Sequence, residues 1–291
     1  MKDLRTFLYM CAFILLPACT GQIKENSQVD TVCISQTISE MQADDVIAGI
    51  NLTVAEGKRL IAKGIVYHPK VKERLTKGIV IITSGTTNTY IAEELAGLDA
   101  PHGSLMTGNV IPHGREDIAK GLTRVPNIIL IDGVKTDMNF EEALEKMQPG
   151  DIVFKGANLL NYEKKQAAVC IGSAVGGTTA HIRKAENAHL IVPIGLEKET
   201  FGDLREYEKL LEGNTDRTTS VPRLWVHTNA EIFTEIEAIK AVASVNVVPF
   251  AAGGIAGREG GISLAVYGKK EEVQKVLDLV ASVQGEPPFV K

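Results

Sequence analysis

The sequence predicts an α/β protein with a doubly wound, mostly parallel sheet, followed by a small α+β module. Short runs of apolar and β-branched residues alternate with segments of helical spacing between residues 51 and about 200. This alternation is typical of a parallel sheet covered by helices. Many of the 27 glycines lie beside the apolar runs, where they permit tight turns. The 291 residues, 44% of them hydrophobic, suffice for one large domain or for a domain with a smaller companion.

The chain is organised around residues 78–96, GIVIITSGTTNTYIAEELA. Residues 79–83 are expected to form a buried strand and residues 88–96 a helix. The turn between them consists of Ser84, Gly85, Thr86 and Thr87. The first N–H groups of a helix lack internal partners and attract anions, so this turn predicts an anion site. The alternative is that Ser84 or Thr86 only caps the helix.

A second strand–turn–helix unit has a similar composition. Residues 167–171 predict an apolar strand and residues 180–187 a helix. The ligand-binding candidates in the turn between them are Gly176, Gly177, Thr178 and Thr179. Ligands of open parallel sheets bind beyond the carboxyl ends of the strands. We therefore expect two anion-facing turns at the same edge of one sheet.

Further apolar runs at residues 127–131, 151–155 and 189–193 are expected to be strands of the same sheet. Glu197 follows the last of these runs. It could line the edge of the sheet, although a surface position is the simpler expectation.

The pattern changes after a charged segment at residues 199–220. The expected strands are residues 223–227, 245–251 and 261–267, and the expected helices are residues 230–244 and 270–283. This β-α-β-β-α order matches most of a ferredoxin-like unit. We therefore expect an α/β ligand-binding domain at residues 51–220 and a ferredoxin-like module at residues 221–291. The glycine-rich loop at residues 252–261 either contacts a ligand or serves as a flexible turn.

The N-terminus has the features of a targeting segment. Basic residues precede an apolar run at residues 6–16, which is too short to span a bilayer comfortably, and the letters LPACTG follow. The end of this segment resembles the lipobox of bacterial lipoproteins. We expect a signal peptide at residues 1–18, a lipidated Cys19 and a polar tether at residues 19–50, with the protein held extracytoplasmically at a membrane. The alternatives are an ordinary secretory signal or an upstream extension of a cytoplasmic protein.

Composition argues against several classes of function. The net charge is −5 and no basic run stands out, so no nucleic-acid partner is expected. The four cysteines form no CxxC pair, which argues against a zinc site and a disulfide framework. No Walker lysine, complete GxGxxG, GxSxG or HExxH motif occurs, so no cofactor or metal is expected. The oligomeric state stays open.

Three sequence pieces carry a distant resemblance to a known superfamily. They are SGTT at residues 84–87, IDG at residues 131–133 and FKGANLL at residues 154–160, with Glu163 shortly after. In order and strand context they resemble the superfamily of ribose-5-phosphate isomerase, glucosamine-phosphate deaminase and the CoA transferases. The resemblance covers roughly residues 78–195.

The resemblance implies roles for individual residues. The turn at residues 84–87 would hold phosphate, Asp132 and Lys155 would contact a sugar, and Glu163 would transfer a proton. The second glycine-rich turn, residues 172–179, looks more like a cofactor or CoA contact than an isomerase feature.

Two functions follow, and the sequence leaves both open. The first is an enzyme of the isomerase or transferase type that acts on a phosphorylated sugar or an acyl-thioester. The second is a membrane-anchored sensor or scavenger that binds an anionic metabolite without chemistry.

Overall fold

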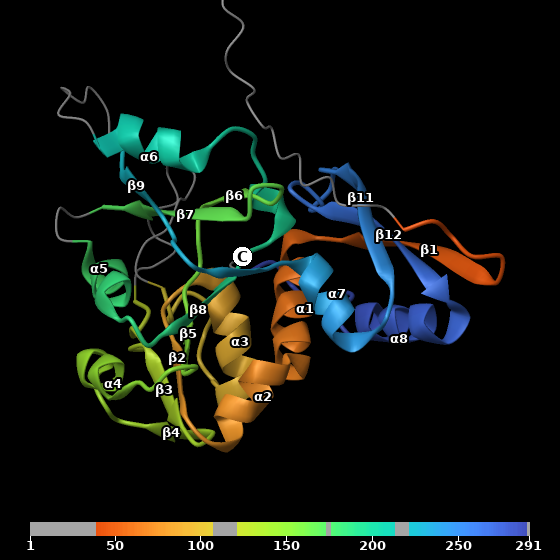
Figure 1. Ribbon diagram of the computed structural model, residues 1–291. Coiled ribbons are helices and arrows are strands. Elements are labelled where there is room, and N and C mark those ends of the chain that lie inside the picture. Colours follow the sequence, from red (N-terminus) through yellow and green to blue (C-terminus); the bar gives the residue numbers. More distant parts are fainter. Residues whose placement is uncertain (1–38, 107–120, 173–175, 213–220, 290–291) are drawn as a thin grey trace, which may run out of the picture. The chain divides into compact units, whose positions relative to one another are not determined.

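The computed structural model describes residues 39–106, 121–172, 176–212 and 221–289 (Figure 1). All of them belong to one unit of the chain, Gln36–Lys291. The predicted signal peptide at residues 1–18 and the predicted lipidation site Cys19 lie outside the described residues. Within the described ranges, no helix is long and apolar enough to cross a bilayer.

A six-stranded sheet with the order β10-β8-β5-β2-β3-β4 forms the centre of this unit. Its strands are β2 (Ile79–Ile82), β3 (Ile128–Ile131), β4 (Val134–Thr136), β5 (Ile152–Phe154), β8 (His189–Pro193) and β10 (Glu231–Phe233). The first four strands in this order run parallel, whereas β3 and β4 are antiparallel to their neighbours. The α/β class and the mostly parallel sheet are thus confirmed.

The described part of the chain also contains helices and one 3-10 helix. They are α1 (Val54–Tyr67), α2 (Pro69–Thr76), α3 (Thr86–Ala96), α4 (Phe140–Lys146), α5 (Gly177–Lys184), η1 (Leu196–Lys198), α6 (Leu204–Glu212), α7 (Glu235–Val242) and α8 (Lys270–Ala281). In Figure 1, α1, α2 and α3 lie on one side of β2, β5 and β8, and α4 and α5 lie on the other. Every residue of β2 and β5 is buried, as expected of strands covered on both faces.

Local sequence features explain where helix α1 begins and ends. Thr53 and Glu56 form a capping box, in which the Thr53 hydroxyl accepts from the Glu56 N–H and the Glu56 carboxylate accepts from the Thr53 N–H. Pro69 starts α2 because it cannot continue α1. Gly64 allows α1 to approach α7 closely, since a Cβ at this position would lie 2.4 Å from Ala238 Cα. The crossing of α1 and α7 brings residues of both helices to one end of the sheet.

A second, antiparallel sheet contains β6 (Leu159–Asn161), β7 (Gln166–Ile171) and β9 (Arg223–Val226). The expectation that the two glycine-containing turns follow strands of one sheet is therefore wrong. Strand β7 follows β6 through a turn of four residues, and so short a connection produces an antiparallel pair.

A third sheet has the order β1-β12-β11, with β1 (Asp45–Leu52), β11 (Asn246–Ala252) and β12 (Ile262–Lys269) all antiparallel. Strand β1 lies inside the segment predicted to be a tether. The folded part therefore begins before residue 51. The side chains of Ile50 and Leu52 alternate with exposed neighbours and enter the core, which explains why this short segment forms a strand.

The predicted boundary near residue 220 is also corrected. Strand β9 pairs with β7, β10 joins the central sheet, and β11 and β12 pair with β1 instead of with β9. A separate ferredoxin-like module at residues 221–291 is therefore not found. The predicted helix at residues 230–244 begins later, because a capping box at Thr234 and Glu237 starts α7 only after β10 has ended.

Candidate functional site

Several ionisable residues, most of them buried, lie where the four parallel strands of the central sheet end. Lys155 follows β5, η1 after β8 supplies Glu197 and Lys198, and Glu235 follows β10. Helix α1 and the segment after β9 add two further side chains. We name the set the edge cluster; its members are Lys58, Lys155, Glu197, Lys198, His227 and Glu235. The carboxyl ends of parallel strands are the usual ligand-binding edge of an open α/β sheet.

The turn between β2 and α3 is fixed at this edge by hydrogen bonds to β5. The N–H and the hydroxyl of Thr83 donate to the Phe154 carbonyl at 3.1 Å and 2.8 Å. The Asn88 amide also donates to this carbonyl, at 3.1 Å. The first turn of α3 is therefore held beside the chain segment that carries Lys155.

Helix α3 begins without a side-chain cap, because its N-cap residue is Gly85. The described residues offer no hydrogen-bond partner to the N–H groups of Thr86 and Thr87. The Oδ1 atom of Asn88 is buried, and no described group bonds to it. The N–H groups of Thr86 and Thr87 are therefore available as donors, as an anion site requires, whereas the Asn88 oxygen can only accept a hydrogen bond.

Lys155 is buried next to this turn. Thr83 is its neighbour on the adjacent strand, since Ile82 pairs with Phe154 in the sheet register. Lys155 is only 8% exposed, and it forms neither a hydrogen bond through its ammonium group nor an ion pair with any described residue. Burial lowers the pKa of Lys155. A largely buried lysine without a counter-ion is costly, which is unusual for a lysine with a purely structural role.

His227 lies beside the same segment. Its Nε2 atom is 3.4 Å from the Gly156 carbonyl, and its backbone N–H donates to Ala167 at 2.8 Å. Burial, and secondly the positive charge of Lys155, lower the pKa of His227 to about 4. The imidazole is therefore neutral at pH 7.

Glu235 is the most deeply buried acid of the cluster. It is 2% exposed, and its Oε2 accepts the Leu196 N–H at 3.0 Å. Its Oε1 lies against α1, where a Cβ at Gly57 would be only 2.7 Å away. Burial, and secondly the negative charge of Glu197, raise the pKa of Glu235.

Glu197 and the two neighbouring lysines complete the cluster. The Oε1 atom of Glu197 lies 3.8 Å from the Lys58 ammonium, and it is buried without a hydrogen-bond partner among the described residues. The Lys198 ammonium donates to the Ala157 carbonyl at 2.8 Å. Burial lowers the pKa of Lys198, against the opposing effect of the negative charge of Glu197. The edge therefore combines cations, carboxylates and a neutral imidazole in a largely buried setting.

The structure brings only part of the sequence-predicted site to this edge. The turn Ser84–Thr87 and Lys155 are there, whereas Asp132 is not. Strand β3 is antiparallel to β2, so its end lies beside the start of β2 at the opposite edge. There the Asp132 carboxylate accepts the Gly78 N–H at 2.8 Å. Asp132 thus stabilises a turn far from the carboxyl ends of the parallel strands.

Glu163 is likewise outside the edge cluster. It lies in the turn between β6 and β7 and is exposed. The structure does not bring it together with Asp132 or Lys155 through any contact between described residues.

The second predicted turn belongs to the β7–α5 connection. Gly176 is required by packing, since it has a positive φ of 72° and a Cβ there would lie 2.4 Å from Trp225. Gly177, Thr178 and Thr179 form the first turn of α5. Among the described hydrogen bonds, none joins this turn to Ser84–Thr87.

Sequence reasoning missed four members of the edge cluster: Lys58, Lys198, His227 and Glu235. Glu197 was expected on the surface, but its Oε1 is buried. The detectable signal was a charged residue directly after a short apolar strand, as in IGLEK after β8 and TE after β10. Only the strand order reveals that these short stretches meet.

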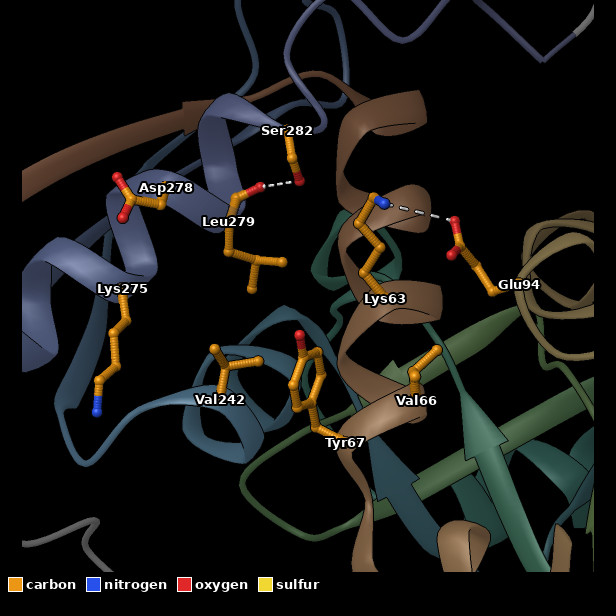
Figure 2. Close-up of a pocket in the computed structure, with 9 residues that line it drawn as sticks. All are labelled: Lys63, Val66, Tyr67, Glu94, Val242, Lys275, Asp278, Leu279 and Ser282. Atoms are coloured by element: carbon orange, nitrogen blue, oxygen red, sulfur yellow. Dashed lines mark hydrogen bonds and ion pairs between the residues drawn. The ribbon is translucent and has the colours of Figure 1, made fainter.

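Two hollows lie elsewhere on the described surface. One, of about 410 Å³, lies between α1, α7 and α8, and its lining includes Val66, Val242 and Leu279 (Figure 2). At its rim Lys63 pairs with Glu94 at 3.7 Å. The other, of about 760 Å³, lies at the opposite edge of the sheet around Asp132 and Arg74. Members of the edge cluster line neither hollow.

Comparison with known proteins finds no match to a family model, to a curated protein or to a solved structure. In the described part of the chain, no group of three or more metal-ligating side chains is suitably arranged for a metal ion.

Proposed function

We propose that the carboxyl edge of the parallel strands binds an anionic small molecule of the phosphorylated-sugar or CoA type. The observation that carries this proposal is the largely buried side chain of Lys155, whose ammonium group has no counter-ion among the described residues. An anion would supply the charge that Lys155 lacks. The uncapped start of α3, held beside Lys155 by Thr83 and Asn88, would supply N–H donors to the same anion.

The resemblance to the isomerase and CoA transferase superfamily agrees with this choice of ligand. The same resemblance implies a doubly wound arrangement of the sheet. It assigns phosphate binding to the turn Ser84–Thr87, which is at this edge. The resemblance also gives Glu163 a role in proton transfer. The position of Glu163 in an exposed hairpin turn does not support that role. Isomerase or transferase chemistry at this edge would need other acids. The alternative function is a sensor or scavenger that binds the anion without chemistry.

The N-terminal sequence adds a proposal about location. Its apolar run and Cys19 favour a lipid-anchored protein outside the cytoplasm, with residues 1–18 removed. Phosphorylated sugars and CoA are chiefly cytoplasmic. An exported protein would therefore suit the sensor or scavenger function better than the enzyme.

The binding proposal is tested by thermal unfolding with ribose 5-phosphate and with CoA. Ribose and pantetheine, which lack the phosphate groups, serve as ligand controls. A ligand present at about 100 times its Kd stabilises the folded state by about 2.7 kcal/mol, which a melting curve detects readily.

Two variants locate the site. Lys155→Met removes the cation, and Gly156→Ala adds a methyl group where nothing lies within 4 Å in the free protein. Both should reduce the shift, whereas Lys164→Met, in the exposed β6–β7 turn, should leave it unchanged. The proposal would be contradicted if neither phosphorylated ligand shifted the melting curve. Equal shifts in wild type and Lys155→Met would also contradict it.

A further inference from the structure

We propose that the last described residues, 285–289, form a strap that positions the start of α3 and docks more firmly when an anion binds there. We name these residues the C-terminal strap. The inference rests on the proposed function, because the ligand is the anion proposed for the start of α3. It adds a regulatory contact from a distant part of the sequence.

The C-terminal strap follows α8 and is fastened to α1. The Gly285 N–H donates to the Glu56 carboxylate at 2.8 Å. The Glu286 carboxylate accepts two hydrogen bonds from the Arg59 guanidinium group, at 2.9 Å and 3.2 Å. Both side chains of this ion pair are largely buried, with 14% and 15% of their areas exposed. Paired bonds of this kind fix the orientation of the two groups as well as contributing energy.

Phe289, at the end of the strap, packs on the loop that follows α3. Its ring stacks on the His102 imidazole, with centroids 4.7 Å apart and ring planes 16° apart. Tyr90 of α3 lies edge-on to His102, at 5.0 Å between centroids, and 5.8 Å from Phe289. The His102 Nε2 atom is also 2.8 Å from the Glu93 carboxylate, which belongs to α3. The strap, α3 and the loop therefore meet in one aromatic cluster.

The loop connects this cluster to the start of α3. His102 lies in a turn in which the Ser104 N–H donates to the Pro101 carbonyl at 3.0 Å. Ser104 and Leu105 are buried. The Leu105 carbonyl accepts the Gly85 N–H at 2.9 Å, and Gly85 is the N-cap of α3. Because the next two N–H groups of α3 are the proposed anion donors, docking of the strap on this loop helps to hold them in position.

The strap is held by few bonds, as a segment that opens and closes requires. Pro287 and Pro288 have no N–H groups, so this part of the strap donates no backbone hydrogen bonds. Phe289 is only half-buried. Terminal segments with so few bonds open at low cost. If docking of the strap favours anion binding, linkage requires that the anion favour docking by the same factor.

Hydrogen exchange without ligand tests the positioning. In Phe289→Ala the amides of Gly85 and Ser104 should exchange about two- to tenfold faster than in wild type, because the aromatic contact is lost. Phe289→Tyr keeps the ring and should restore the wild-type rates. Phe201→Ala, at a phenylalanine that is 83% exposed, is the matched control and should change neither amide. Unchanged rates in Phe289→Ala would overturn the positioning.

Calorimetric titration and hydrogen exchange with ribose 5-phosphate test the coupling. Phe289→Ala should raise the Kd about two- to tenfold, whereas Phe289→Tyr and Phe201→Ala should bind like wild type. In wild type the ligand should slow the exchange of the Gly285 and Glu286 amides, an effect that purely structural packing of the strap would not produce. Binding without slower exchange there, or equal Kd values in wild type and Phe289→Ala, would overturn the coupling. Absence of wild-type binding would overturn the proposed function together with the coupling, while the exchange measured without ligand would still decide the positioning.

Discussion

His227 gives the sharpest stability prediction. Its pKa is lowered to about 4 by burial, and secondly by the charge of Lys155, whereas an imidazole in the unfolded chain titrates near 6.5. Below pH 6.5 the unfolded chain therefore binds a proton that the folded protein excludes. Stability must fall as the pH falls, until about pH 4, where the folded protein accepts the proton too. Between pH 7.5 and 5.0 this group alone lowers the free energy of unfolding by about 2 kcal/mol.

Urea unfolding of wild type and His227→Gln at pH 7.5 and pH 5.0 measures this effect. The variant should lose about 2 kcal/mol less than wild type over this interval, whatever its stability at pH 7.5. His181→Gln, at a more exposed histidine, should leave the loss unchanged. Lys155→Met should reduce the loss, because it removes the second cause of the shift. Equal pH dependence in wild type and His227→Gln would refute the assignment of a buried neutral imidazole.

Three other predictions concern the packing, the opposite edge and the N-terminus. Gly64→Ala should destabilise the protein by about 1–3 kcal/mol and lower its Tm. The new Cβ would lie 2.4 Å from Ala238 Cα, so α1 and α7 would have to separate. An unchanged Tm would contradict the close crossing of these helices. The pKa of Glu231 is lowered to about 2, chiefly by its hydrogen bond to His68. Wild type should therefore lose stability as the pH falls from 4.5 to 2, and Glu231→Gln should lose less. Parallel acid denaturation curves of the two proteins would refute this role. Intact-mass measurement of membrane-extracted protein should show a chain that begins at Cys19 and carries lipid; an unprocessed chain in the soluble fraction would refute the lipoprotein hypothesis.

The sequence predicts the individual elements well because their signals are local. The run IVII of β2 is buried on both faces, and the capping box at Thr53 and Glu56 starts α1, so periodicity and capping suffice for both. Strand pairing is not local. Periodicity cannot show that β3 runs antiparallel to β2. Because of this strand direction, Asp132 lies at the opposite edge of the sheet.

The same limit explains what sequence reasoning missed at the site. The position of Ser84–Thr87 at this edge is predictable because strand, glycine and hydroxyl residues are adjacent in the chain. Glu197 and Glu235 lie 38 residues apart and meet only because β8 and β10 are neighbours in the sheet. An isolated glutamate after a strand reads as a surface charge, since burial of its carboxylate depends on α1 and η1. Pairing across the sheet, not residue type, creates the edge cluster.

The most direct test of the central claim is a crystal structure of the protein with bound ribose 5-phosphate or CoA. We expect a phosphate group within hydrogen-bonding distance of the Lys155 ammonium or of the N–H groups that open α3. A ligand bound instead in the hollow around Arg74 and Asp132, at the opposite edge of the sheet, would contradict this account.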